Sequence, residues 1–317
     1  MKELTIIMPF RNEREQVFKT CESFNRHCNP DLFDILCIDD CSESGYDYAE
    51  VEKFGNVTLL GNEQRLGVAG SRDKGVKWCE TKYVLLVDAH MRVFTDVITP
   101  LLEKLRAYPG TLLCCQSKII RYAKEKNGYE VERCPKTRGV KLNGKRLDLS
   151  FLDYHWEVLK SSDLLSDVLP IQCCMGACYA MERDHYLHLH GLNGLQQWGM
   201  DEQFLSAKMW MSGGKVLLLK NIEIAHIYRE GTPVPYQSFG GSKLLNQLIV
   251  VYLLADEGMF LQFRESVRHS AAYRIAKDTL DIFDELLPDL RRERNYLQLL
   301  MKRPFTYFLN LAENGRI

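Results

Sequence analysis

The segment YVLLVDAHMRV, residues 83–93, decides the fold. Its first five residues are continuously apolar and rich in valine, which predicts a strand buried on both faces, as in a parallel sheet. Asp88 and His90 follow directly, and side chains two positions apart on an extended chain point the same way. A carboxylate and an imidazole placed together suit Mn²⁺ or a similar divalent ion. Taken alone, the triplet favours the alternative, in which the aspartate caps the next helix and the histidine bonds the backbone.

Strand-like and helix-like segments alternate on the N-terminal side of this strand. Continuously apolar strand segments and amphipathic helical segments follow one another four times within about ninety residues, a pattern that means a parallel sheet with crossover helices. The predicted strands are 4–10, 33–40, 56–62 and 82–90, and the predicted helices are 13–27 and 67–80.

Acids and histidines gather where these strands end, the edge at which open parallel sheets bind ligands. A GxGxxG loop and a Walker loop are both absent from the sequence, so a metal is the better candidate to neutralise a pyrophosphate. The strand-end residues are Pro9, Arg11, Asn12 and Glu13 after the first strand, Asp39 and Asp40 after the second, Asp88 and His90 after the fourth, and His226 on a late strand.

The bulk composition excludes some classes of protein. The 317 residues carry a formal charge of −1, which gives no overall attraction to nucleic acid or anionic membrane. The longest apolar run, LIVVYLLA (248–255), is far shorter than the roughly 20 residues of a membrane span. The N-terminus does not read as a signal peptide, and the 11 cysteines form no CxxC pair. We therefore expect a cytoplasmic protein with reduced thiols and no transmembrane segment.

Two basic clusters stand out on this neutral chain. They are either solvated surface or a grip for a polyanionic acceptor. The clusters are Lys136, Arg138, Lys141, Lys145 and Arg146 in a predicted hairpin or loop (121–150), and Arg291, Arg292, Arg294, Lys302 and Arg303 in a helical tail with expected breaks at Pro288 and Pro304.

Five ordered motifs resemble those of a known family. MPFRNE (8–13), IDDCS (38–42) and VDAH (87–90) are similar to the nucleotide-sugar half of family-2-like GT-A glycosyltransferases. RLGVAGSRDKG (65–75) keeps the arginine and glycine spacing of the polypeptide N-acetylgalactosaminyltransferases. WGMDEQFLSAKMWMSGG resembles the Trp-Gly-Gly-Glu-Asn segment of that family, with Met200, Asp201 and Glu202 at its Gly-Glu-Asn positions. HIYREGTPVPY resembles the segment that carries the third metal ligand.

The resemblance implies a GT-A fold, an α/β architecture with a mostly parallel central sheet flanked by helices. It implies Mn²⁺ or Mg²⁺ as cofactor and a UDP-sugar as donor. The implied metal ligands are Asp88, His90 and His226. The implied donor-binding residues are Pro9, Arg11, Asn12, Glu13, Asp39, Asp40, Arg65, Arg72, Asp88, Arg229 and Tyr236, where the alternative for Asp39 and Asp40 is helix capping. The implied catalytic residues are Trp198 over the donor, with Asp201 and Glu202 as a general base or as positioners of hydroxyls.

We expect a GT-A domain over 1–241, with a nucleotide-binding half (1–95) and an acceptor half (96–241), followed by a helical extension (242–317). The expected reaction moves a sugar from a UDP-sugar to a hydroxyl. The acceptor is open between a hydroxymethylated base in viral DNA, a cytosolic protein Ser/Thr and a glycan. A non-catalytic nucleotide-sugar binder is the remaining alternative, although all three metal ligands are present. The donor sugar, the stereochemical outcome and the oligomeric state are not predicted.

Overall fold

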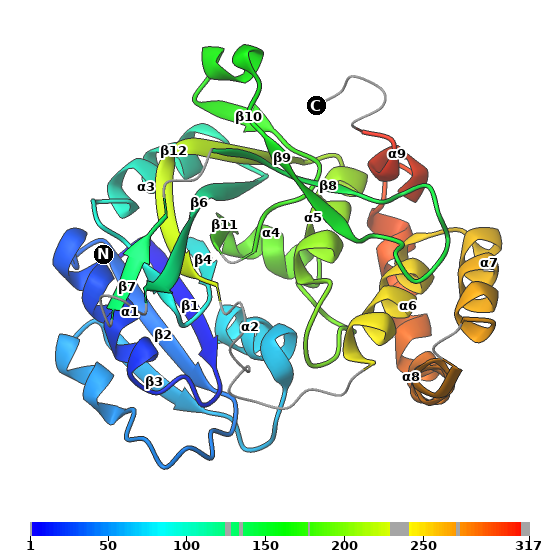
Figure 1. Cartoon of the computed structure of the whole chain (residues 1–317), viewed down its shortest axis with the longest axis horizontal. Helices are drawn as coiled ribbons and strands as arrows, with labels where there is room; N and C mark the ends of the chain where they lie inside the picture. The colour runs from blue at the N-terminus through cyan, green and yellow to red at the C-terminus, as the bar shows by residue number, and fades with distance from the viewer. Residues whose placement is uncertain are drawn as a thin grey trace.

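The central feature of the computed structural model is a mixed sheet with helices on both faces (Figure 1). Residues 2–123, 128–132, 136–176, 178–228, 241–270 and 273–311 are described. Along the main path the strand order is β10-β12-β6-β11-β4-β1-β2-β3. The strands are β1 (Leu4–Phe10), β2 (Phe33–Asp39), β3 (Val57–Gly61), β4 (Tyr83–Val87), β5 (Met91–Arg92), β6 (Thr111–Ala123), β7 (Gly128–Val131), β10 (Val168–Pro170), β11 (Cys178–Glu182) and β12 (Lys215–Ile227), with β8 (Thr137–Leu142) and β9 (Tyr154–Val158) as a separate pair.

The parallel arrangement predicted for the first four strands is confirmed. β1 lies between β2 and β4 and pairs in parallel with both, and β2 pairs in parallel with β3. Every residue of β1 and β4 is buried, as a continuously apolar strand requires when helices cover both faces. Because β4, β1 and β2 are parallel, their carboxyl ends meet at one edge of the sheet. β11 lies antiparallel between β4 and β6.

The helix that follows β3 lies unusually close to the sheet. This helix is α2 (Gly67–Trp78). A Cβ at Gly75 would lie 2.7 Å from side-chain atoms of both Ile38 and Ile7, so only glycine permits this approach. The close packing carries Arg72, on the same helix, under the carboxyl ends of β1 and β4.

The C-terminal helices join the core of the sheet. Figure 1 shows them gathered on one side of the molecule, and residues of α6, α7 and α8 share one hydrophobic cluster with residues of β4, β6 and β12. The expected break at Pro288 is wrong, because α8 runs through it, with buried Phe283, Leu290 and Leu297 holding both halves to the core. The helices are α1 (Glu15–His27), α2, α3 (Ile98–Ala107), α4 (Arg183–His188), α5 (Asp201–Ser212), α6 (Ser242–Leu254), α7 (Glu257–Arg268), α8 (Tyr273–Leu300) and α9 (Phe305–Leu309).

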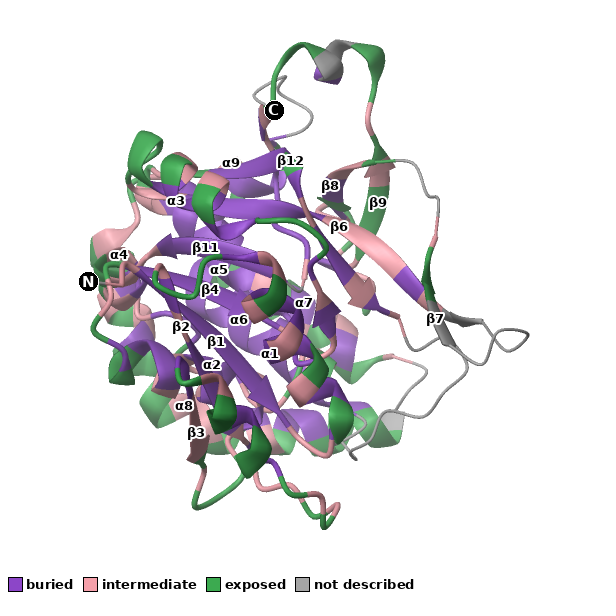
Figure 2. Cartoon of the chain, turned by 90° about the vertical axis from the view of Figure 1, so that its left-hand side faces the viewer, coloured by how far each residue is buried: buried purple, intermediate pink, exposed green. Residues whose placement is uncertain are grey.

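The segment predicted as a hairpin or loop contains more strand than expected. β6 and β7 form one hairpin, and β8 pairs with β9 beyond it. Figure 2 shows β1 and β2 buried whereas β9 is exposed. Among the described residues, no helix is long and apolar enough to cross a membrane.

Candidate active site

A cleft of about 360 Å³ opens at the carboxyl ends of β1 and β4. Most of the sequence-predicted site residues line it. They are Pro9, Arg11, Glu13, Asp40, Arg65, Arg72, Asp88, His90, Trp198, Asp201, Glu202 and His226. Asn12 and Asp39 are not among the lining residues, and Arg229 and Tyr236 lie outside the described part of the chain.

Asp88, His90 and His226 come together at one side of this cleft. One potential ligand atom from each lies within 4.8 Å of the others. The Nε2 atoms of the two histidines are 3.0 Å apart, and Nε2 of His226 is 3.5 Å from Oδ2 of Asp88. All three side chains are only partly exposed, by 14 to 28%.

A short strand ladder brings the two histidines together. His90 immediately precedes β5, which pairs with β12 so that Met91 lies opposite His226. The amide of Ile227 also donates to the carbonyl of His90 at 3.1 Å. The two imidazoles, 136 positions apart in the sequence, are therefore set by backbone register.

The three side chains fit a divalent ion. One carboxylate oxygen and two imidazole nitrogens form a donor set that Mn²⁺ accepts. Oε2 of the buried Glu13 lies 3.5 Å from Nδ1 of His90. A carboxylate in this position commonly orients a histidine whose other nitrogen binds a metal. Burial alone would raise the pKa of Asp88, but the hydrogen bond from His226 and the charge of Arg72 outweigh it and hold that pKa well below its usual range. Asp88 is therefore a carboxylate at neutral pH, as a metal ligand must be.

Arg72 joins this group to the start of α5. Its guanidinium is buried and donates to Asp88 at 2.9 Å, to Asp201 at 3.0 Å and to the hydroxyl of Tyr179 at 2.8 Å. Both carboxylates thus compete for one cation. Arg72 was predicted to bind the nucleotide, whereas the guanidinium nitrogens of Arg72 here bind the two carboxylates. Tyr179 was not predicted, because it lies within an apolar strand.

Asp201 and Glu202, at the N-terminus of α5, differ in their surroundings. Oδ2 of Asp201 accepts from Arg72, while its buried Oδ1 makes no hydrogen bond within the described residues. Burial raises the pKa of Asp201, although Arg72 opposes that shift, and burial raises the pKa of Glu202 as well. Gly176 leaves room for the second acid, since a Cβ there would lie 2.4 Å from Oε1 of Glu202. Glu202 is thus the acid that faces the cleft without an ion pair in the part of the chain described.

The loop that carries Trp198 has an uncommon backbone. Gln197, Gly199 and Met200 have φ values of 47°, 102° and 70°. These conformations keep the chain out of the helix, so α5 begins at Asp201. The indole of Trp198 is 50% exposed at the cleft. Gly67 lies against this loop, and a Cβ on it would fall 2.3 Å from the Cα of Gln197.

The acids after β2 hold loops together. Asp40 accepts from the amides of Leu66 and Gly67 at 2.7 and 2.9 Å and so caps the start of α2. Asp39 accepts from the amide of Ser42 at 2.8 Å. The Asp40 contact is a helix cap, the alternative raised from the sequence, whereas Asp39 closes a loop and caps no helix among the described residues. The amide of Asn12 donates to Oγ of Ser42 at 2.8 Å, which ties the loop after β1 to the loop after β2.

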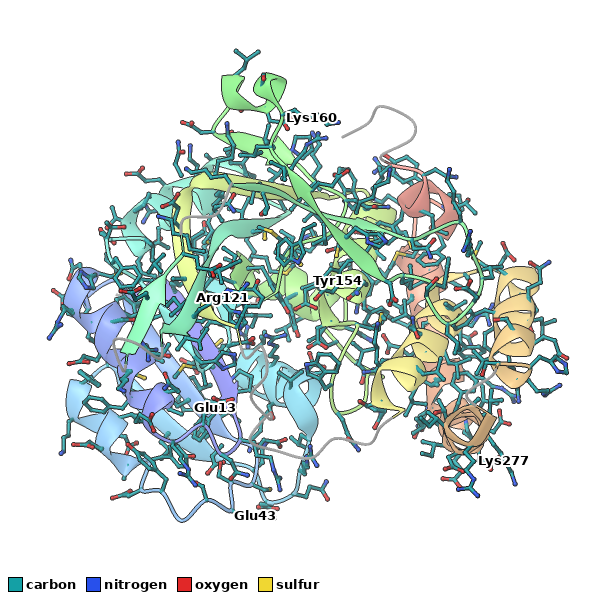
Figure 3. All side chains as sticks on the ribbon, in the orientation of Figure 1. Glu13, Glu43, Arg121, Tyr154, Lys160 and Lys277 are labelled. Atoms are coloured by element: carbon teal, nitrogen blue, oxygen red, sulfur yellow. The ribbon has the colours of Figure 1, made fainter. Side chains whose placement is uncertain are left out.

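The opposite wall of the cleft is aromatic. Tyr154 and Trp156 are 52 and 42% exposed on β9, and both line the cleft. Figure 3 labels Tyr154 on this strand. The basic clusters are partly neutralised by carboxylates. The paired cations are Lys136 with Glu223, Arg138 with Asp163, Arg292 with Asp289 and Arg294 with Glu257.

Comparisons with known proteins find similarity to glycosyltransferases. A model of the family "Glycosyl transferase family 2" matches residues 5–186. Human polypeptide N-acetylgalactosaminyltransferase 10 is 25% identical over 287 residues, which cover 86% of this chain and 45% of that protein. N-acetylgalactosaminyltransferase 4 of Drosophila melanogaster is 25% identical over 320 residues, 98% of this chain and 47% of that protein.

A solved structure shares the fold. The crystal structure of GalNAc-T7 with UDP, GalNAc and Mn²⁺ superposes with a TM-score of 0.72 at 20% identity, covering 99% of this chain and 57% of that one. The predicted GT-A fold is thereby confirmed. The chain spans about half the length of the curated relatives it matches. The family model covers more than half of the 317 residues, and the chain belongs to glycosyl transferase family 2.

Proposed function

We propose that this chain is a metal-dependent glycosyltransferase that moves a sugar from a UDP-sugar to a hydroxyl of a polypeptide. The observation that carries the proposal is the convergence of Asp88, His90 and His226 within 4.8 Å of one another in a cleft that also holds Glu202. The names of the relatives support it, as do the UDP and Mn²⁺ bound in the GalNAc-T7 structure.

The donor is held on the side of the strand ends. Asp88, His90 and His226 would bind the ion, and Glu13 orients His90. When bound, Mn²⁺ or Mg²⁺ supplies Lewis acidity toward the charge that develops on the departing diphosphate. Arg65 is exposed at the rim and makes no ion pair within the described residues, so its charge is available to a phosphate. Arg11 lines the same region and donates to the carbonyl of Asp40 at 3.0 Å.

The reacting sugar lies toward α5. Glu202 accepts a hydrogen bond from a hydroxyl, because its carboxylate faces the cleft and makes no ion pair with the described residues. Asp201 acts through Arg72, which it holds against Asp88. Trp198 covers the donor and excludes water from the sugar–phosphate bond. In transfer, that bond breaks and UDP departs with its electron pair, the acceptor oxygen bonds to the anomeric carbon, and the hydroxyl proton passes to a phosphate oxygen of the departing UDP.

A polypeptide is favoured over nucleic acid as acceptor. The human relative above carries polypeptide in its name, and four cations of the two basic clusters are paired with acids. The aromatic wall formed by Tyr154 and Trp156 suits an extended chain with apolar side chains. A hydroxymethylated DNA acceptor, which the sequence analysis left open, would need phosphate-binding cations that these ion pairs reduce.

The test is release of UDP from a panel of UDP-sugars with and without Mn²⁺. Each donor is offered with Ser/Thr-containing peptides, with hydroxymethylated DNA, with a glycan and with water alone. We expect Mn²⁺-dependent release that rises with peptide. Release that rises only with DNA or glycan would overturn the acceptor assignment. The absence of release with every donor would overturn the catalytic assignment and favour a binding protein.

A further inference from the structure

Two adjacent amide side chains are buried in a helix that is otherwise apolar. Asn246 and Gln247 are 0 and 2% exposed on α6, where most neighbours are leucine, isoleucine and valine. Burying an amide without partners costs free energy that a leucine would not. The two residues are therefore expected to satisfy groups that no apolar residue could.

Asn246 holds the loop that carries Trp198. Its Oδ1 accepts from the amide of Gln196 at 2.7 Å. Its Nδ2 donates to the carbonyls of Gln196 at 2.7 Å, of Gly199 at 2.8 Å and of Trp198 at 3.2 Å. One side chain thus bonds the loop on both sides of Trp198, next to the positive-φ residues Gln197 and Gly199. Such a backbone persists only where surrounding contacts impose it.

Gln247 holds the opposite wall. Its Nε2 donates to the carbonyls of Phe151 at 2.6 Å and of Leu149 at 3.2 Å, in the loop that leads into β9. At the rim, Nζ of Lys243 donates to Asp153 in the same loop at 2.5 Å. Since β9 carries Tyr154 and Trp156, this loop sets where the aromatic wall stands.

We infer that Asn246 and Gln247 are positioning residues, through which α6 sets the two walls of the cleft relative to each other. Asn246 fixes the Trp198 loop over the donor, and Gln247 fixes the β9 wall that meets the acceptor. Because the two amides are consecutive on one rigid helix, the distance between the loops they hold is set by α6. The assignment of one wall to the donor and the other to the acceptor rests on the proposed function. The hydrogen bonds of Asn246 and Gln247 to the two loops, here called the brace, do not.

The brace is tested by hydrogen exchange, which requires no activity. Asn246→Ala is expected to speed exchange in peptides covering 194–200 and to leave 147–153 unchanged, and Gln247→Ala is expected to do the reverse. Val250→Ala is the matched control, because it removes buried side-chain volume from the same helix, and a valine side chain makes no hydrogen bond to either loop. Asn246→Ser, which carries one hydroxyl in place of the amide and cannot make all four of these contacts, serves if the alanine variant does not fold. Equal exchange in both loops for all variants would overturn the brace.

The positioning role is tested by the Michaelis constants for the two substrates and by the ratio of hydrolysis to transfer. None of these quantities changes when a smaller fraction of the protein is folded. Asn246→Ala is expected to raise the KM for the UDP-sugar and the ratio of hydrolysis to transfer, since a freed Trp198 loop admits water. Gln247→Ala is expected to raise the KM for the peptide alone. Misplacement by about 1 Å can cost up to about a hundredfold in rate, which sets the scale of the loss. A lower kcat with unchanged KM values and unchanged partition would reduce both residues to structural support.

The two proposals fail in distinguishable ways. If the wild-type chain turns over no UDP-sugar, the proposed function fails while the exchange experiment still decides the brace. If turnover is found but exchange is the same in both loops, the brace fails and the proposed function stands.

Discussion

The two walls of the cleft are held in different ways. On the proposed donor wall, the strand register and a buried guanidinium fix Asp88, His90 and His226, and the amide of Asn246 holds only the Trp198 loop. On the proposed acceptor wall, exposed aromatic rings stand on an edge strand whose leading loop is held by a side-chain amide of α6. Groups that perform chemistry gain from rigid elements, whereas specificity resides in segments that can differ without disturbing the core.

The largest effect is expected from the donor wall. His226→Ala removes one of three proposed metal ligands, and turnover is expected to fall by at least about a thousandfold, equivalent to about 4 kcal/mol of lost stabilisation. His188→Ala is the matched control, because His188 is exposed on α4 and does not line the cleft. Initial rates of UDP release at saturating Mn²⁺ measure both. Equal rates for the two variants would show that His226 is not a metal ligand needed for turnover.

Arg72→Met tests whether the donor wall depends on a buried ion-pair network. Breaking a buried pair on one side leaves carboxylates uncompensated, so we expect a loss of about 3–5 kcal/mol in the free energy of unfolding. The additional change Asp201→Asn should restore part of that loss, because it removes one orphaned charge. Urea denaturation measures the two variants and the wild type. An unchanged midpoint in Arg72→Met would show that the network contributes nothing to the fold.

The buried Lys208 makes the free energy of unfolding depend on pH. This fully buried lysine donates to the carbonyls of Leu189 and Gly191, ahead of the Trp198 loop, and burial lowers its pKa to about 8. Below that pH both folded and unfolded chains are protonated, and the fold bears the cost of a buried charge. As the pH rises from 8 toward the ordinary value of 10.5, only the folded chain loses the proton.

The unfolding free energy should therefore rise over pH 8 to 10.5, by about 3 kcal/mol relative to Lys208→Met. Parallel urea titrations of the two proteins across this range measure the difference, which cancels the alkaline effects common to both. A difference that stays flat, or that falls as the pH increases, would contradict the assignment.

The smallest effect is expected from the acceptor wall. Trp156→Ala should raise the KM for a peptide acceptor by about tenfold and leave the KM for the UDP-sugar unchanged, since a single aromatic contact is worth about 1–2 kcal/mol. Trp78→Ala is the control, because Trp78 is similarly exposed at 52% and does not line the cleft. Steady-state kinetics with each substrate varied in turn give both constants. A change in the KM for the UDP-sugar would contradict the assignment of Trp156 to the acceptor side of the cleft.

The sequence predicted the donor wall better than the acceptor wall, and the reason is physical. Strand ends are visible as apolar runs that stop at polar residues, so Asp88 and His90 could be found from a local pattern. His226 could also be found as a histidine on a late strand, but its grouping with Asp88 and His90 needed the family resemblance, because a strand ladder between distant segments leaves no local signal. The same holds for the bond of Arg72 to Asp201, which spans 129 positions.

Other features escaped prediction because apolar runs are ambiguous. The segment IQCCMGACYAME (171–182) has the pattern of one strand, yet among its described residues only Cys178–Glu182 form a strand, and Cys173, Cys174 and Gly176 line the cleft instead. Pro288 reads as a helix break, but core contacts on both sides override it. Asn246 and Gln247 did carry a signal, two amides inside an apolar helix, although their partners could not be named without the fold.

A titration of Mn²⁺ followed by electron paramagnetic resonance tests the central claim most directly. Free Mn²⁺ gives a six-line signal that weakens on binding, so the bound fraction is measured without catalysis. Relative to a blank of Mn²⁺ with UDP alone, the wild-type chain is expected to bind one further equivalent, and the chain with Asp88→Ala, His90→Ala and His226→Ala together is expected to leave the signal of the blank unchanged. Identical titrations for the two proteins would contradict the metal site and, with it, the proposed chemistry of the donor wall.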